Sequence, residues 1–194
     1  MLDRFTYPNG DYYEGEYIQS QNGILKQGHG TYIGLFTGSL AAGNQSENCS
    51  TDSCTLKPSQ KLVDEECNGT PFYLSSSKCR EIIARSKLGI YSGMWNSDRI
   101  EGFGTAIFPN GAVYEGEFID GKMHGEGIYW WSSGYVLKGF FVKNRLVIGS
   151  SVTLTDPQGN EWNGVWNGDN EVTGKRKNKE KAAKTRLFFK LKGF

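Results

Sequence analysis

The sequence of 194 residues lacks the features that define several large protein classes. It contains no apolar run of about 18 residues, so a membrane-spanning helix is excluded on length. It begins MLDRFTYPNG, without the basic segment and apolar core of a secretory signal peptide. A reducing compartment is therefore expected, where disulfides between the four cysteines would be rare. These observations predict a cytoplasmic protein.

Residues that carry catalysis are also scarce. Only two histidines occur, His29 and His124, and neither has a Cys or carboxylate at a spacing typical of a triad or metal site. Cys49 and Cys54 have four residues between them, a spacing that zinc could use. Cys67 and Cys79 are too far apart to form the second half of a zinc knuckle. Free thiols are the main prediction there, with zinc as the alternative. We expect no catalytic residue, no cofactor and no metal.

Glycine and aromatic residues are abundant, whereas Leu, Ile and Val are sparse. The net charge of +1 hides an asymmetry, because residues 175–194 hold nine Lys or Arg and one Glu. The formal charge is therefore +8 for this tail and −7 for the remaining chain. An acidic body with a basic tail indicates two parts with different partners.

A five-residue pattern, aromatic-x-Gly-x-aromatic, recurs along the chain. It occurs as YEGEY at 13–17, YSGMW at 91–95, YEGEF at 114–118 and WNGVW at 162–166, with a degenerate LKGFF at 137–141. Successive starts from 91 are separated by 23, 23 and 25 residues. Gly-x-Gly pairs follow the pentads, and Pro-Asn-Gly or a similar turn precedes the next one. The period predicts a hairpin of strand, turn, strand and turn.

The pentad explains why the hairpin repeats. In YEGEF, Tyr114, Gly116 and Phe118 share one face of a strand, and the two glutamates face the other way. A lone hairpin is marginal in water. Stacked hairpins bury a continuous aromatic seam, so each unit needs a copy beside it.

These residues resemble the MORN repeat (membrane occupation and recognition nexus), over about 7–33 and 90–174. The resemblance implies an all-β fold, an elongated single-layer antiparallel sheet of stacked hairpins. It also implies a non-catalytic scaffold or tether near membranes or cytoskeleton. Two departures stand out: the first copy holds four extra residues, and the LKGFF copy has Ile148 and Ser150 in place of the glycine pair.

The predicted organisation has four parts: a first hairpin region at 1–33, an insert at 34–89, contiguous repeats at 90–174 and a basic tail at 175–194. The insert is rich in Ser, Asn and Cys and is predicted to be mostly loop, with a short helix at 77–88. The tail has apolar residues at a helical spacing among its lysines, which predicts a basic amphipathic helix.

Two candidate binding surfaces follow. A protein partner is expected on the uncovered part of the aromatic and glycine face, for which the candidates are Tyr91, Trp95, Tyr114, Phe118, Trp130, Trp162 and Trp166. The tail is expected to bind an anionic membrane or an acidic partner. The candidate residues there are Lys175, Arg176, Lys177, Lys181, Lys184, Arg186, Phe188, Phe189 and Lys190.

The main functional prediction is a non-catalytic scaffold that binds a protein partner and is positioned at membrane or cytoskeleton by its tail. One alternative is a recruitment module that binds anionic phospholipid. Another is the MORN regulatory region of a larger enzyme, such as a phosphatidylinositol phosphate kinase. Nucleic-acid binding is not expected because the body is acidic. Open sheet edges make a homodimer a further prediction.

Overall fold

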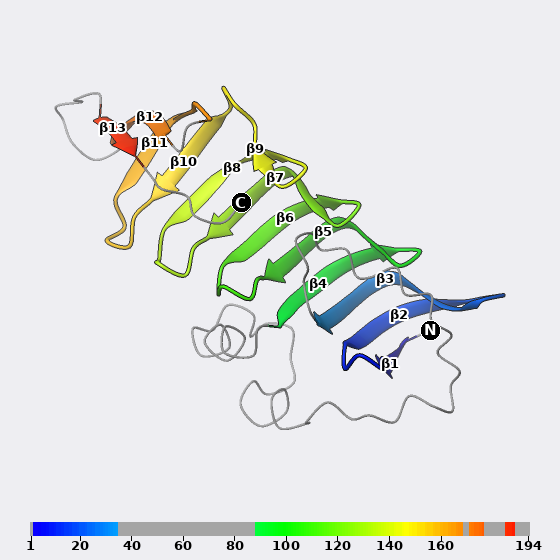
Figure 1. The fold of residues 1–194 in the computed structure, drawn as a ribbon. Helices are drawn as coiled ribbons and strands as arrows, with labels where there is room; N and C mark the ends of the chain where they lie inside the picture. Colours follow the sequence, from blue (N-terminus) through cyan, green and yellow to red (C-terminus); the bar gives the residue numbers. More distant parts are fainter. Residues whose placement is uncertain (1, 35–87, 169–170, 177–184, 189–194) are drawn as a thin grey trace.

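The protein was analysed as a computed structural model, which describes residues 2–34, 88–168, 171–176 and 185–188. These ranges hold thirteen strands of one antiparallel sheet and no helix (Figure 1). The strands are β1 Leu2–Thr6, β2 Tyr12–Ser20, β3 Gly23–Gly34, β4 Gly89–Asn96, β5 Arg99–Ile107, β6 Val113–Ile119, β7 Lys122–Trp130, β8 Val136–Val142, β9 Arg145–Leu146, β10 Ser151–Thr155, β11 Glu161–Trp166, β12 Glu171–Arg176 and β13 Thr185–Phe188. The all-β, single-layer fold predicted from the repeats is confirmed.

Strand order follows chain order, so each strand pairs with its sequence neighbours, except that β9 and β10 both pair with β8 and not with each other. The pairing continues across the insert: β3 and β4 align from Gly34 opposite Gly89 to Gly28 opposite Trp95. The first hairpin is therefore stacked on the later ones as though the chain were uninterrupted. The helix predicted at 77–88 falls almost entirely outside the described residues, as do all four cysteines.

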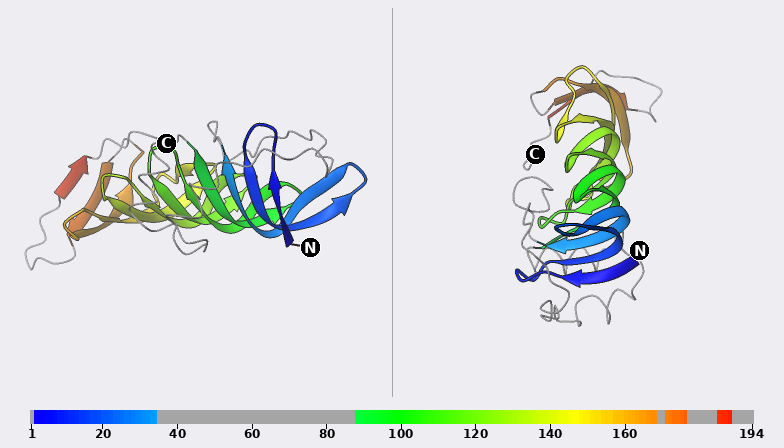
Figure 2. Two further views of the ribbon diagram at one scale, coloured as in Figure 1. Left: turned by 90° about the horizontal axis from the view of Figure 1, so that it is seen from below. Right: turned by 90° about the vertical axis from the view of Figure 1, so that its right-hand side faces the viewer.

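The sheet is elongated, and its strands curve strongly when it is viewed along its length (Figure 2). The aromatic side chains fill the inside of this curve. A ladder of paired glycines crosses the same face, from Gly15 opposite Gly30 on β2 and β3 to Gly127 opposite Gly139 on β7 and β8. A Cβ built on Gly116 would lie 2.6 Å from the Tyr114 hydroxyl and 2.7 Å from Gly127 Cα. Glycine is required there because rings and backbones approach so closely.

Six rings form a continuous edge-to-face series over the glycine ladder. In order they are Tyr13, Trp95, Tyr91, Phe118, Tyr114 and Phe141, with successive centroids 5.1–5.5 Å apart. Each tyrosine hydroxyl turns back onto the backbone, as Tyr91 does in donating to the Met94 carbonyl at 3.0 Å. We call this series the aromatic ladder. It is the core that joins one hairpin to the next.

Both departures from the repeat pattern have visible consequences. The four extra residues of the first copy lengthen the β2–β3 hairpin by two pairs, Gln19 opposite Ile24 and Ser20 opposite Gly23. In the LKGFF copy the second strand is divided into β9 and β10, which both pair with β8. Residues 147–150 turn between them, and the Ser150 hydroxyl donates to the Val147 carbonyl at 2.6 Å. The strand divides because the usual glycine pair is absent.

The prediction of a helical tail is wrong for the part that the structure describes. Thr185–Phe188 forms β13, which pairs with β12 from Glu171 opposite Phe188 to Gly174 opposite Thr185. The outer edge of β12 offers backbone groups for pairing, and a segment with one β-branched and one aromatic residue can extend along it. A stretch this short fits both helical and strand spacing, which is why the sequence pattern misled.

Candidate interaction surface

The aromatic residues predicted to meet a partner are mostly core. Tyr91, Trp95, Tyr114 and Phe118 are at most 1% exposed, and Trp166 is also buried. The prediction is wrong for these five because the curved sheet closes over its own rings. Trp130 and Trp162 are half-buried. Trp130 lies on the opposite face, where it packs against Ile107 and Val113.

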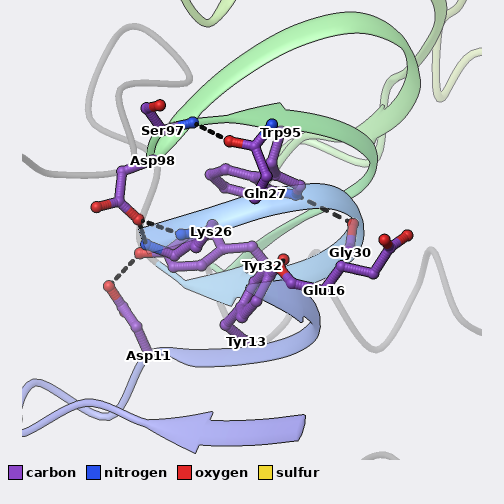
Figure 3. Close-up of polar contacts among 10 residues, drawn as sticks. All are labelled: Asp11, Tyr13, Glu16, Lys26, Gln27, Gly30, Tyr32, Trp95, Ser97 and Asp98. Carbon is purple, nitrogen blue, oxygen red and sulfur yellow. Dashed lines mark hydrogen bonds and ion pairs between the residues drawn. The ribbon is translucent and has the colours of Figure 1, made fainter. Parts of the chain in front are cut away.

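A polar cluster that the sequence analysis missed lies in the first hairpin (Figure 3). Lys26 is buried, and its ammonium lies 5.1–5.6 Å from the ring centroids of Tyr7, Tyr13 and Trp95. Its Nζ is 3.2 Å from Asp98 Oδ1. The same oxygen accepts a hydrogen bond of 2.8 Å from the Lys26 backbone amide. The cluster joins β3 to the β4–β5 turn, on either side of the insert.

The repeat alignment shows why Lys26 is unusual. It pairs with Tyr17 as Ile100 pairs with Trp95 and Met123 with Phe118. Every other hairpin thus places an apolar side chain where the first places a cation. Comparison of the copies position by position would have found this residue from the sequence.

A second polar contact lies beside it. Asp11 is buried and accepts hydrogen bonds from the Tyr32 hydroxyl and, at 2.7 Å, from Asn9 Nδ2. Burial raises the pKa of the Tyr32 hydroxyl, and the Asp11 carboxylate raises it further. These groups satisfy one another inside the fold, so they stabilise the first hairpin and offer no open site.

The outer face of the sheet offers an open surface instead. A shallow hollow of about 390 Å³ is lined by His29, Ser92, Met94, Phe103, Thr105 and Glu115, with the backbone of Gly93 and Gly104. We call it the outer hollow. Met94 and Phe103 adjoin the pair formed by Gly93 and Gly104, so they are neighbours across β4 and β5. Their side chains are 42% and 58% exposed.

In the two flanking hairpins the equivalent positions are polar, whereas the later pentads carry Phe140 and Val165 at the position of Met94. Where YSGMW places Met94, the flanking pentads place Glu16 and Glu117, and where the second hairpin has Phe103 the third has Glu126. These glutamates are exposed. An apolar residue at these positions does not contribute to the aromatic ladder. The exposed pair is therefore unexplained by the needs of the fold.

Comparison with protein families matches the MORN repeat at residues 91–113 and 114–134. This chain contains two adjacent MORN repeats. Among curated proteins, alsin from Mus musculus, Pan troglodytes and Homo sapiens each share 38% identity with it over 60 residues. That match covers 28% of this chain and 4% of alsin, so the chain spans a small part of these relatives' length.

The two matched MORN repeats carry most of the outer hollow. Met94, Phe103 and Thr105 lie in the first matched repeat and Glu115 in the second. The hollow depends on a contact between neighbouring MORN repeats, since its walls come from β3, β4, β5 and β6.

The C-terminal repeats present a different chemistry on the same face. Phe140 and Val142 are exposed on β8, and Lys138, Lys143 and Arg145 are exposed around them. We call these five residues the basic patch. Of the predicted tail residues, Lys175 and Arg176 lie in β12, and Arg186 and Phe188 in β13. Lys177, Lys181, Lys184, Phe189 and Lys190 lie outside the described residues.

No group of three or more His, Cys, Asp or Glu residues in the described ranges could hold a metal ion. No helix in the same ranges is long and apolar enough to cross a bilayer.

Proposed function

We propose that this MORN-repeat chain is a non-catalytic, cytoplasmic scaffold that binds a protein partner on its outer face at the outer hollow. The observation that carries the proposal is the exposure of Met94 and Phe103 side by side, at positions where the two flanking hairpins carry glutamate or histidine. MORN repeats generally serve as interaction modules, which agrees with this assignment. The aromatic ladder supplies the rigid support, and the outer face supplies the contact.

The test compares proteins purified with the full chain and with M94E/F103E, quantified by mass spectrometry. A matched control is I119E/V165E, because Ile119 and Val165 are also exposed on the outer face, by 48% and 44%. We expect a set of proteins that the hollow variant loses and the control retains. If both variants retain the same proteins, the outer hollow is not the docking surface.

A membrane-recruitment function is the second candidate, and the basic patch favours it. Exposed apolar side chains among Lys and Arg suit an anionic bilayer surface, where each basic residue contributes about 1 kcal/mol. Lys175, Arg176 and Arg186 extend the same end of the sheet with further positive charge. This candidate would place the chain at a membrane or at the cytoskeleton beneath it.

Vesicle co-sedimentation tests the second candidate. The full chain is mixed with neutral vesicles and with vesicles of phosphatidylcholine and phosphatidylserine at low and physiological salt. We expect anionic vesicles alone to pellet the chain, and K138Q/K143Q/R145Q to weaken this pelleting. Equal pelleting of both proteins would show that the basic patch does not contribute to vesicle binding.

Two further proposals concern assembly. The match to a short part of alsin supports the alternative that this array serves a larger protein, as a regulatory region of an enzyme would.

The outer edges of β1 and β13 have no neighbouring strand in the described sheet, which supports a homodimer. A light-scattering mass of one chain at micromolar concentration would contradict the dimer.

A further inference from the structure

We infer that the outer hollow accepts a basic segment of a partner protein that carries one large apolar side chain. The inference rests on the proposed function and names the chemistry of the partner. It follows from three properties of the hollow: its floor, its walls and the charges that surround it.

The floor and walls suit a single apolar anchor. Gly93 and Gly104 form part of the lining, and a Cβ on either would point to Tyr91 on the inner face, so their backbone forms the floor of the hollow. The thioether of Met94 and the ring of Phe103 stand beside it. A flexible Met and an aromatic ring adapt to aliphatic or aromatic side chains. The Thr31 hydroxyl and the Ser92 hydroxyl share a hydrogen bond of 3.0 Å, which closes the β3 side.

The charges around the hollow are predominantly negative. Glu115 lines it directly. Glu117 pairs with Phe103 across β5 and β6, and Glu16 Oε1 accepts a hydrogen bond from the His29 amide at 3.0 Å. Glu101 lies on β5 and Glu126 on β7, the strand next to β6. Arg99 and Lys122 lie at the turn ends of these strands, and Lys138 lies on β8, opposite Ile128 of β7. Carboxylates on both sides of an apolar centre complement Lys or Arg on both sides of an apolar residue.

The same charges argue against a lipid surface at this place. An anionic bilayer would be repelled by Glu16, Glu115 and Glu117. The basic patch lies on β8, β9 and the turn between them, and β8 is two strands from β6, which carries Glu115. The two ends of the outer face therefore suit ligands of opposite charge.

The experiment selects peptides from a random 12-residue display library on the full chain. Binders to M94E/F103E are removed by counter-selection, and the remaining peptides are synthesised. Binding is measured by fluorescence anisotropy at low and physiological salt. We expect the selected sequences to carry Lys or Arg on both sides of a Leu, Met or Phe. M94E/F103E should weaken their binding at least about tenfold. E115Q/E117Q should weaken it about three- to tenfold and flatten its salt dependence.

Each alternative outcome has its own meaning. Peptides that need Met94 and Phe103 but lack basic residues would overturn the inferred partner chemistry and leave the proposed docking surface intact. Recovery of no peptide that depends on these two residues would overturn both. Loss of anionic-vesicle binding in M94E/F103E would identify a lipid surface instead. Tighter peptide binding by K177Q/K181Q/K184Q, by more than about threefold, would identify the chain's own tail as the occupant.

Discussion

At the residue scale, the array depends on places where no side chain can fit. Gly116 and Gly127 face each other beneath the Tyr114 ring. The atoms that a new Cβ would meet at Gly116 include the Glu126 carbonyl oxygen, at 2.7 Å. Backbone atoms of a paired strand cannot move aside as the end of a flexible side chain can. The glycine ladder therefore fixes both the closeness of the strands and the position of the rings.

Gly116→Ala tests this view. We expect a loss of about 3 kcal/mol in the free energy of unfolding, because overpacking is enforced by backbone and ring together. Gly159→Ala is the control: no atom lies within 4 Å of its Cβ, and only its positive φ of 80° is strained. That strain should cost about 1–2 kcal/mol. Urea denaturation measures both, and equal losses would refute the close-approach argument.

Lys26 shows how one copy can depart from the pattern and remain stable. Asp98 Oδ1 accepts from the Lys26 amide as Asn144 Oδ1 accepts from the Met123 amide, both at 2.8 Å. The third hairpin thus provides an uncharged version of the same contact. The ammonium adds only the ion pair and the contact with three rings.

A double-mutant cycle follows from this equivalence. Asp98→Asn leaves a buried ammonium without its counter-charge, so we expect a loss of about 1–3 kcal/mol, given that Asp98 is partly exposed. Adding Lys26→Met should restore most of that stability, since it reproduces the pair Met123 and Asn144. Thermal unfolding of the four proteins supplies the cycle. Additive losses would mean that the ion pair does not explain the destabilisation.

At the scale of the element, the first three hairpins contain buried tyrosines that do not easily ionise. Burial raises the pKa of Tyr129 from 10 to about 12. Burial also raises the pKa of Tyr7, Tyr13, Tyr32, Tyr91 and Tyr114. Between the ordinary tyrosine pKa of 10 and the raised pKa of the folded state, the unfolded chain loses tyrosine protons that the folded chain keeps. These tyrosines therefore leave the free energy of unfolding unchanged below about pH 10 and lower it as the pH rises further.

We expect a cooperative alkaline transition as a result. Absorbance at 295 nm should show an early step from the more exposed tyrosines and a delayed step from the buried ones. The delayed step should coincide with loss of the far-ultraviolet circular dichroism signal. A single ionisation step near pH 10 with the dichroism unchanged would contradict the burial of these hydroxyls.

Much of the hairpin could be predicted from the sequence. The pentads, the Gly-x-Gly pairs and the turns set the strands and their period, and the extra residues of the first copy lengthen its hairpin. Burial of Tyr91 and Trp95 could not be predicted in full, because alternation identifies a face but not how far the sheet curves over it. The outer hollow could not be found from the repeated residues, because Met94 and Phe103 stand where the first three pentad repeats differ from one another.

At the scale of the whole molecule, the sheet is continuous although its sequence is not. Ile33 opposite Ile90 matches Ile107 opposite Val113, which the five-residue loop FPNGA joins. The strands on either side of the insert therefore end as those of an ordinary repeat do.

Replacing residues 34–89 with FPNGA tests whether the described array sustains itself. We expect the shortened chain to fold, with a melting temperature within about 5 °C of the parent, because the β3–β4 pairing and the aromatic ladder are retained. Circular dichroism and thermal melts measure this. A chain that fails to fold, while a version with a longer Gly-Ser linker folds, would mean only that FPNGA is too short. Failure of both would show that the insert supports the sheet.

The central claim is that a rigid, self-filled aromatic ladder displays a partner site on the outer face. The most direct measurement places the photo-crosslinking residue benzoylphenylalanine at position 103 of the full chain in cells, with position 119 as the control. Phe103 and Ile119 have similar exposure, 58% and 48%. The account predicts a discrete covalent adduct from position 103 that M94E abolishes, and none from position 119. Adducts of equal yield from both positions, or none from 103, would contradict it.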